Sequence, residues 1–481
     1  MVTIAPKALV RMLRSAPRSR ASRSAVAVAF AVVVVISLLV GIREPLRVAF
    51  PISGVLVGGY LIRSDPPSYV SFTLWLWVLS PLVRRLVDYS IGWKDPSLIL
   101  LTPYLVSALA APPLTWSLLS SRHISCAAIA KYLAFILPTA AITYGFMAGL
   151  LLNPPAAAAT ELLNWLVPLV FGWYVAVLAE RYANLQTSIA TTFQWAISIA
   201  GLYGIYQFIV APAWDGYWLD NVGARSMGTP EPFHIRVFST MHSPAVLAIT
   251  VVVGLTMWLG APKLAILPGM LAACVALLLS QVRSAWVVFA IALLFLVPSL
   301  KVKSVFRLAI ATALIIPLLV LAVSREPFNL VITDRFATLG SLSQDESAYA
   351  RMESDEKAIN KAMQNPLGFG LGAPDDLSSG DVTLRDSVLM AALAQLGFGG
   401  CALYLAGVLL LFRIAWLWRR QKESALSVAM ASVLIALAAQ IYIGSNTLGP
   451  GGVCFWTLGG LAVARRRRMD VSRFGYSPRV V

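Results

Sequence analysis

The chain has 481 residues, of which 58% are hydrophobic and only 12% are charged, and its formal net charge is +16 at pH 7. Its mean hydropathy is +0.77. A soluble domain needs far more charged surface, so this composition excludes an ordinary soluble protein and predicts an all-α polytopic membrane protein. The positive charge is interpreted as a signal of membrane orientation, and nucleic acid is not an expected partner.

The apolar segments follow one another almost without interruption. After a basic tail at 1–24, we expect N-terminal transmembrane helices within 25–210, a short polar loop at 211–242, transmembrane helices within 243–323, a long polar loop at 324–387, C-terminal helices within 388–464, and a second basic tail at 465–481. About fourteen segments are long enough to span a bilayer as helices, although one pair among the first four could be re-entrant. These are 25–40, 47–62, 69–83, 97–113, 128–152, 160–178, 188–210, 243–260, 264–281, 284–299, 306–323, 388–412, 425–443 and 451–464.

The distribution of charge predicts the orientation. Fourteen crossings put both termini on one side, and Lys and Arg concentrate on the cytoplasmic side of membrane proteins. With both tails in the cytoplasm, most of the 38 Lys and Arg residues are cytoplasmic and most of the 22 Asp and Glu residues lie outside. Arg84, Arg85 and Lys94 are exceptions, because this assignment places them outside. Both polar loops are then expected on the outer face.

The long polar loop has two recognisable parts. Apolar residues at helical spacing predict an amphipathic helix from about 345 to 364, lying along the membrane surface. Asn365 and Pro366 end it, because the residue before a proline disfavours α geometry. The following Gly368, Gly370 and Gly372 predict a flexible turn whose backbone approaches a ligand closely.

Two arginines on the outer face are candidate site residues. Arg283 lies where two spans leave almost no loop between them, and a charge at that depth needs a counter-charge or a water-filled cavity. Arg236 precedes a span on the same face. Guanidinium forks bind phosphate oxygens in pairs, so two convergent arginines suit a diphosphate. The alternatives are a snorkelling side chain for Arg283 and an ordinary surface charge for Arg236.

The polar loops offer four further candidates. Asp386 either accepts a proton from a sugar hydroxyl or caps the helix that begins near Ser387. His242 either acts as a base or phosphate ligand or makes ordinary hydrogen bonds. Arg351 holds a phosphate or sugar or is a solvated charge, and Arg385 lies beside Asp386. The sequence has no zinc-ligand spacing, nucleophile elbow or Asp-rich magnesium motif, so we expect a metal-independent reaction without a cofactor.

Three strings of residues resemble a known superfamily. They are Arg236 to Pro244 at the entry to a span, Ser280 to Ser284 at a span end, and Asn365 to Gly372 followed by Arg385-Asp386-Ser-Val-Leu and Gln395 to Gly399. Over about residues 200 to 412 the chain resembles the superfamily of O-antigen ligases and Wzy-type polysaccharide polymerases. This resemblance implies a glycosyltransferase C-type architecture with a long periplasmic loop in the bacterial inner membrane, and undecaprenyl-diphosphate-linked glycans as substrates.

The resemblance also implies roles. Arg236 and Arg283 would hold the diphosphate, and Asp386 would be the base if one is used. Arg351, Arg385 and His242, candidates from their residue chemistry, are expected as further substrate-binding residues. Ligases that load lipid A usually have a His where this chain has Asp386, so the chain looks closer to exopolysaccharide or capsule polymerases. The resemblance therefore implies a polymerase that extends one lipid-linked repeat unit with another, next to a chain-length regulator and a flippase. The alternatives are a ligase acting on lipid A core or protein, and a lipid-linked oligosaccharide flippase.

Overall fold

The computed structural model describes residues 20–119, 126–223, 225–300, 302, 305–306, 355–360, 362–373, 387–442, 444 and 446–473. In these ranges the chain is all-helical, with 15 α-helices. They are α2 (Arg20–Val40), α3 (Leu46–Ser64), α4 (Pro66–Ile91), α5 (Leu98–Ala108), α6 (Ala111–Leu119), α7 (Cys126–Leu152), α8 (Pro155–Arg181), α9 (Leu185–Val210), α10 (Ala213–Val222), α11 (Pro244–Gly260), α12 (Leu267–Leu279), α13 (Arg283–Leu296), α17 (Val388–Arg420), α18 (Ala425–Ala439) and α19 (Gly449–Arg473). The prediction of an all-α polytopic membrane protein is confirmed.

Within the described ranges each predicted span coincides with one helix, except that 97–113 falls on two, and 306–323 lies outside those ranges apart from its first residue. Seven helices or helix pairs are long and apolar enough to cross a membrane. They are Leu46–Ser64, Pro66–Ile91, Leu98–Ser117, Ile129–Leu152, Pro155–Arg181, Leu185–Val210 and Val388–Arg420. Shorter apolar helices, such as α11 and α18, pack among them. Large apolar side chains remain exposed on the outside of the bundle, for example Leu39 (80%) and Leu151 (86%), as expected for a surface that faces lipid.

The predicted span 97–113 is broken in two. α5 ends at Ala108 and α6 begins at Ala111. Pro112 and Pro113 carry no backbone N–H, so neither can donate to the carbonyl four residues earlier, and this favours a break just before them, with both prolines in the first turn of α6. Together the two helices are still long enough to form one membrane span.

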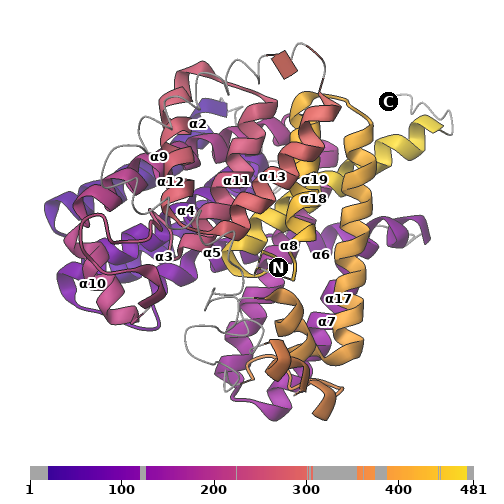
Figure 1. Ribbon diagram of the computed structural model, residues 1–481, viewed down its shortest axis with the longest axis horizontal. Helices are drawn as coiled ribbons and strands as arrows, with labels where there is room; N and C mark the ends of the chain where they lie inside the picture. Colours follow the sequence, from indigo (N-terminus) through magenta and orange to yellow (C-terminus); the bar gives the residue numbers. More distant parts are fainter. Residues whose placement is uncertain are drawn as a thin grey trace, which may run out of the picture.

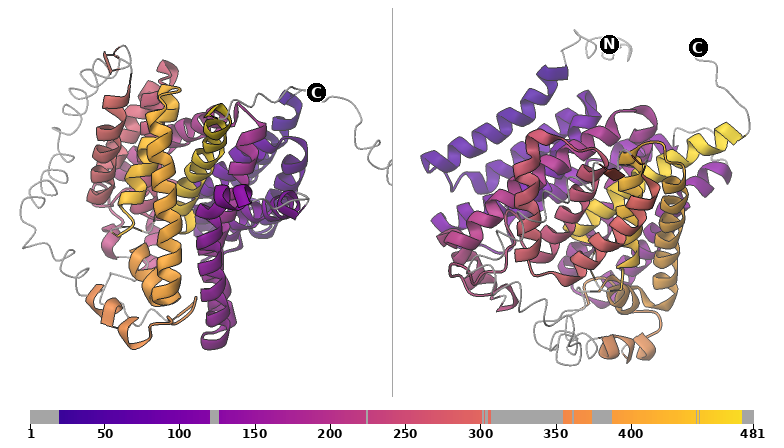
Figure 2. Two further views of the ribbon diagram at one scale, coloured as in Figure 1. Left: turned by 90° about the vertical axis from the view of Figure 1, so that its right-hand side faces the viewer. Right: turned by 45° about the horizontal axis from the view of Figure 1, so that its top comes forward.

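The described parts of the two polar loops lie toward the same side of the bundle. In Figure 1, α10 from the short loop and the orange helical segment around 355–364 from the long loop both lie in the lower part of the molecule, whereas the C-terminal end of α19 points to the upper right. Figure 2 shows the same separation between the orange segment and the C-terminus in a view turned by 90°. The described parts of the polar loops and the C-terminal end of α19 therefore lie at different ends of the fold.

Candidate functional site

The segment 236–241 joins the short polar loop to the turn between α12 and α13. The Arg236 N–H donates to the carbonyl of Met227 at 3.0 Å, and the Val237 N–H donates to the carbonyl of Leu279 at 3.2 Å. The Arg236 guanidinium then reaches the same turn, because its Nε and Nη2 both lie 3.3 Å from the carbonyl oxygen of Ser280. The short loop is thus fastened to the point where α12 ends.

Arg283 begins α13, three residues after that carbonyl. The intervening turn is tight: Ser280 caps the end of α12 through its Oγ, which donates to Leu277 at 2.6 Å, and Gln281 has a left-handed φ of 56°. Arg283 is half-buried. The structure therefore brings the Arg236 guanidinium to the turn that carries Arg283, and it places both arginines at the end of the bundle where α10 lies.

An ion pair that the sequence analysis did not anticipate lies beneath this segment. Arg85 of α4 is 1% exposed, and its Nη1 donates to Asp215 Oδ1 of α10 at 2.7 Å. Asp215 Oδ2 also accepts from Gln207 Nε2 at 2.7 Å and from the Tyr203 hydroxyl at 2.9 Å. Burial raises the pKa of the Asp215 carboxyl, against the opposing effects of Arg85 and these two hydrogen bonds. Loop 211–242 therefore contains a helix whose carboxylate is packed against two spans.

The neighbouring arginines are paired in a similar way. Arg84 is 6% exposed, and its Nε donates to Asp88 Oδ2 at 3.1 Å while its Nη2 lies 3.3 Å from Asp95 Oδ1. Arg47 donates to the other oxygen of Asp88 at 3.1 Å. Carboxylates close by thus compensate the positive charges of Arg84 and Arg85.

His242 lies at the end of the same segment, directly before the N-cap of α11 at Ser243. Its pKa is lowered to about 4, first by burial and then by the positive charges of Arg85 and Arg84. At neutral pH the imidazole is therefore uncharged. Of the two roles predicted from the sequence, ordinary hydrogen bonding by an uncharged imidazole fits this environment better than a base or a cationic phosphate ligand, because a lowered pKa weakens the imidazole as a base.

The glycine-rich string Gly368 to Gly372 packs against helices. The Phe369 and Gly370 N–H groups donate to the carbonyls of Ala394 and Gln395 in α17, and the Leu371 N–H donates to Gly145 in α7. A Cβ atom on Gly370 would lie 2.4 Å from the backbone nitrogen of Gly149. The glycines therefore allow close approach, as predicted, but the prediction of a flexible turn is wrong, because the backbone that comes close is that of α7 and α17.

This packing also bends α17. At Gly397 the helix adopts φ 66° and ψ −177°, and the N–H of Phe398 donates to the carbonyl of Pro366. The predicted helix end before Asn365 agrees with the structure, in which 355–360 and 362–364 are helical and Asn365 is not, whereas 345–354 lies outside the described residues. Residues 365–373 therefore form a backbone anchor, called the glycine anchor below, between α7 and the kink of α17.

The remaining candidates Arg351, Arg385 and Asp386 lie outside the described residues. Among the described residues, Ser387 is the N-cap of α17, and its Oγ accepts the N–H of Met390 at 3.4 Å.

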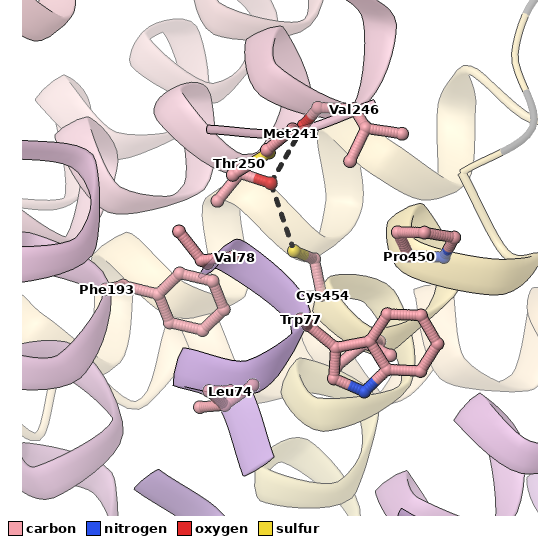
Figure 3. A pocket seen from close by; sticks show the side chains of 10 residues that line it. Leu74, Trp77, Val78, Phe193, Met241, Val246, Thr250, Pro450 and Cys454 are labelled. Carbon is pink, nitrogen blue, oxygen red and sulfur yellow. Dashed lines mark hydrogen bonds between the residues drawn. The ribbon is translucent and has the colours of Figure 1, made fainter. Parts of the chain in front are cut away.

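A small apolar cavity of about 10 Å³ lies next to the segment, between α4, α9, α11 and α19 (Figure 3). Its walls include Trp77, Phe193, Met241 and Cys454, and Thr250 turns its hydroxyl to the Val246 carbonyl at 2.8 Å. A space of this size holds about one water molecule. It has no room for a sugar or a diphosphate. Within the described ranges, three or more His, Cys, Asp and Glu side chains nowhere come together as a metal site would need.

Residues 268–405 match the family model of the O-antigen ligases (Wzy_C). The matched range includes α12 from its second residue on, Arg283 and the glycine anchor, while Arg85, Asp215 and Arg236 precede it. A search of curated proteins gives no match. The expected resemblance is thereby confirmed for this part of the chain. Within a polytopic membrane protein, residues 268–405 form a domain of the O-antigen ligase family.

Proposed function

We propose that this protein is a polysaccharide polymerase, which transfers a glycan from undecaprenyl diphosphate to another lipid-linked repeat unit at the periplasmic face of the inner membrane. One observation carries the proposal. The O-antigen ligase domain contains the α12–α13 turn with Arg283, and the Arg236 guanidinium lies within 3.3 Å of that turn. Two guanidinium groups at one end of a membrane bundle suit the diphosphate of a lipid carrier.

In the proposed reaction, a hydroxyl oxygen of the acceptor sugar attacks the anomeric carbon of the donor glycan. A new glycosidic bond forms, and the bond between that carbon and the diphosphate oxygen breaks. The leaving undecaprenyl diphosphate takes the electron pair, and Arg236 and Arg283 stabilise the negative charge that develops on it. The acceptor proton goes to a base, for which Asp386 is the candidate, and no metal or cofactor takes part.

Further parts of the proposal follow from the same reaction. Arg351, Arg385 and His242 are proposed to contact the diphosphate or the sugars, with His242 as an uncharged group. Both termini are proposed to lie in the cytoplasm, and a chain-length regulator and a flippase are the proposed partners. We also propose that the protein belongs to the subgroup of exopolysaccharide or capsule polymerases, because it has Asp386 where ligases that load lipid A usually have a His.

A second candidate is an O-antigen ligase, which would pass the same donor to lipid A core or to a protein. The description of the matching family favours it. The two activities share the donor and its leaving group, so the arginines would act alike in both. They differ in the acceptor, and the acceptor therefore decides between them.

The test supplies the purified protein in proteoliposomes with lipid-linked repeat units, either alone or together with lipid A core. We expect ladders of lipid-linked polymer with repeat units alone, in buffer that contains a metal chelator. Transfer to lipid A core without elongation would make the protein a ligase. Movement of labelled repeat units across the bilayer without any transfer would make it a flippase, and the proposal of an enzyme would be wrong.

A further inference from the structure

Gln207 holds two consecutive peptide groups of the site segment. It lies in the last turns of α9 and is fully buried. Its Oε1 accepts the N–H of Phe238 at 3.0 Å and the N–H of Ser239 at 2.7 Å, while its Nε2 donates to Asp215 at 2.7 Å. One amide side chain therefore links the segment to the carboxylate of α10.

Arg85 completes this arrangement from the other side. Its Nη2 donates to the carbonyl of Ser239, its Nη1 donates to Asp215, and its guanidinium lies 4.8 Å from the ring centre of Phe238. Asp215 thereby fixes the orientation of both Gln207 and Arg85. Both the N–H and the C=O of Ser239 are thus bound by side chains that share one carboxylate.

Ser239 needs such support, because its φ of 54° lies in the left-handed region, which side chains with a Cβ rarely adopt. Its hydroxyl donates to the carbonyl of Ala200 in α9, so the side chain is held as well. Strained backbone of this kind persists only where the surrounding contacts determine it, and it concentrates at functional sites. The direction in which the chain leaves Ser239 toward Arg236 is therefore set by these contacts.

We infer that Arg85, Gln207 and Asp215 are positioning residues, called the Ser239 clamp, which fix segment 236–241 so that the Arg236 guanidinium stays at the α12–α13 turn beside Arg283. This inference rests on the proposed function, since it assigns to Arg236 the diphosphate of the donor. The clamp lies in α4, α9 and α10, before the matched domain begins at residue 268. The part of the chain outside the family domain would thus contribute directly to its site.

The burial of the clamp indicates that the clamp fixes the backbone geometry of segment 236–241. A buried ion pair repays its desolvation cost only with good geometry and further hydrogen bonds, so apolar side chains of similar volume often stabilise a fold equally well. Here Arg85 and Gln207 both donate to the Asp215 carboxylate, and both bond the backbone of residues 238–239. Arg85 also donates to the carbonyl of Pro81. The bonds to the N–H groups of Phe238 and Ser239 satisfy two buried backbone donors, and because both end on one amide oxygen they also fix the geometry of the turn.

The test compares two substitutions in the same helix. Gln207→Leu removes the clamp contacts, and Gln194→Leu is the matched control, because Gln194 is also a buried glutamine of α9 but bonds the carbonyl of Ala261, which follows α11. We expect Gln207→Leu to lower the elongation rate at saturating substrate at least about tenfold, since a misplacement of about 1 Å costs on that order or more. Gln194→Leu should stay within about twofold of the wild type.

A double-substitution cycle then shows whether Gln207 acts through Arg236. In the Arg236→Lys background the fork is already lost, so adding Gln207→Leu should cost less than about threefold. An equal loss in both backgrounds would overturn the inference, and so would a Gln207→Leu protein as active as Gln194→Leu. If Gln207→Leu shows no melting transition, Asp215→Asn replaces it, with the exposed Asp95→Asn as its control.

Hydrogen exchange in detergent tests the clamp independently of activity. The amides of 237–241 should exchange at least about tenfold faster in Gln207→Leu than in Gln194→Leu. Unchanged exchange there would overturn the clamp even if the protein elongates glycans. If the wild type elongates nothing, the proposed function fails, while the exchange comparison still decides whether these side chains fix the segment.

Discussion

Arg283 is the residue on which the proposed chemistry depends most, because it begins α13 inside the O-antigen ligase domain. Arg283→Lys keeps the positive charge but loses the fork that binds two phosphate oxygens. We expect this variant to lose most of its polymer and Arg283→Ala to lose all of it. The measurement is polymer yield from lipid-linked repeats in proteoliposomes. Elongation at the wild-type rate by purified Arg283→Ala would remove Arg283 from the site.

Asp386 can now be tested against a matched neighbour. Since Ser387 caps α17, Asp386→Asn should leave the melting temperature nearly unchanged, and as a base it should lower the rate on the order of a hundredfold. Ser387→Ala should do the reverse, with a loss of about 1 kcal/mol in stability and little specific loss of rate. A folded Asp386→Asn protein that elongates normally would exclude Asp386 as the base.

His242 gives a prediction for pH. Its pKa is about 4 in the folded protein and 6.5 ordinarily, so between these values the unfolded chain binds a proton that the folded chain does not. Its contribution to stability is therefore complete above about pH 6.5 and falls as the pH drops toward 4. His242→Gln removes this dependence, so its melting temperature should rise relative to the wild type on going from pH 7 to pH 4. A constant difference between the two proteins would contradict the assigned environment.

At the residue scale, sequence reasoning singled out the two half-buried arginines and missed the buried contacts around them. Arg236 and Arg283 stood out because a charged residue directly next to an apolar span is rare. Each can be recognised from its immediate neighbours in the sequence. The Arg85–Asp215 pair joins residues that are 130 positions apart, so no local pattern reveals it. A buried glutamine such as Gln207, surrounded by apolar residues near the end of a span, was the signal that could have pointed to it.

Among the elements, the glycine anchor makes the clearest prediction. Gly370→Ala would place a Cβ 2.4 Å from the backbone of Gly149, at a φ of 75° that alanine rarely adopts. We expect a loss of about 1–3 kcal/mol or more, measured by thermal melting in detergent. Gly399→Ala is the control, because its Cβ would meet nothing within 4 Å. Equal melting temperatures for the two variants would contradict the close packing of the anchor.

Hydrophobic periodicity predicted the helices well, because each apolar segment of sufficient length has to form a helix in lipid. It predicted the contacts between elements poorly. The division of α5 from α6 depends on Pro112 and Pro113, and the helix α10 inside the short polar loop depends on a partner in α4. Such features arise from backbone hydrogen bonding and from pairing over long distances, neither of which a hydropathy pattern contains.

For the molecule as a whole, the orientation in the membrane is a separate prediction. Reporter fusions after Leu339 should be periplasmic, and fusions after Lys303 and Arg420 should be cytoplasmic, because Lys and Arg concentrate on the cytoplasmic side. The measurement is the activity of a reporter that works on one side of the membrane only. A cytoplasmic signal at Leu339 would reverse the side on which the site operates.

The long separation between Arg85 and Asp215 has a consequence for biogenesis. A ribosome that adds about 5–20 residues per second needs roughly 7–26 s to make the 130 residues between them. During that time the partner of Arg85 does not exist, and an unpaired guanidinium stays in contact with water or lipid head groups. We therefore expect α4 to be delivered by the translocon in a shallow position and to settle to its final depth only after α10 has left the ribosome.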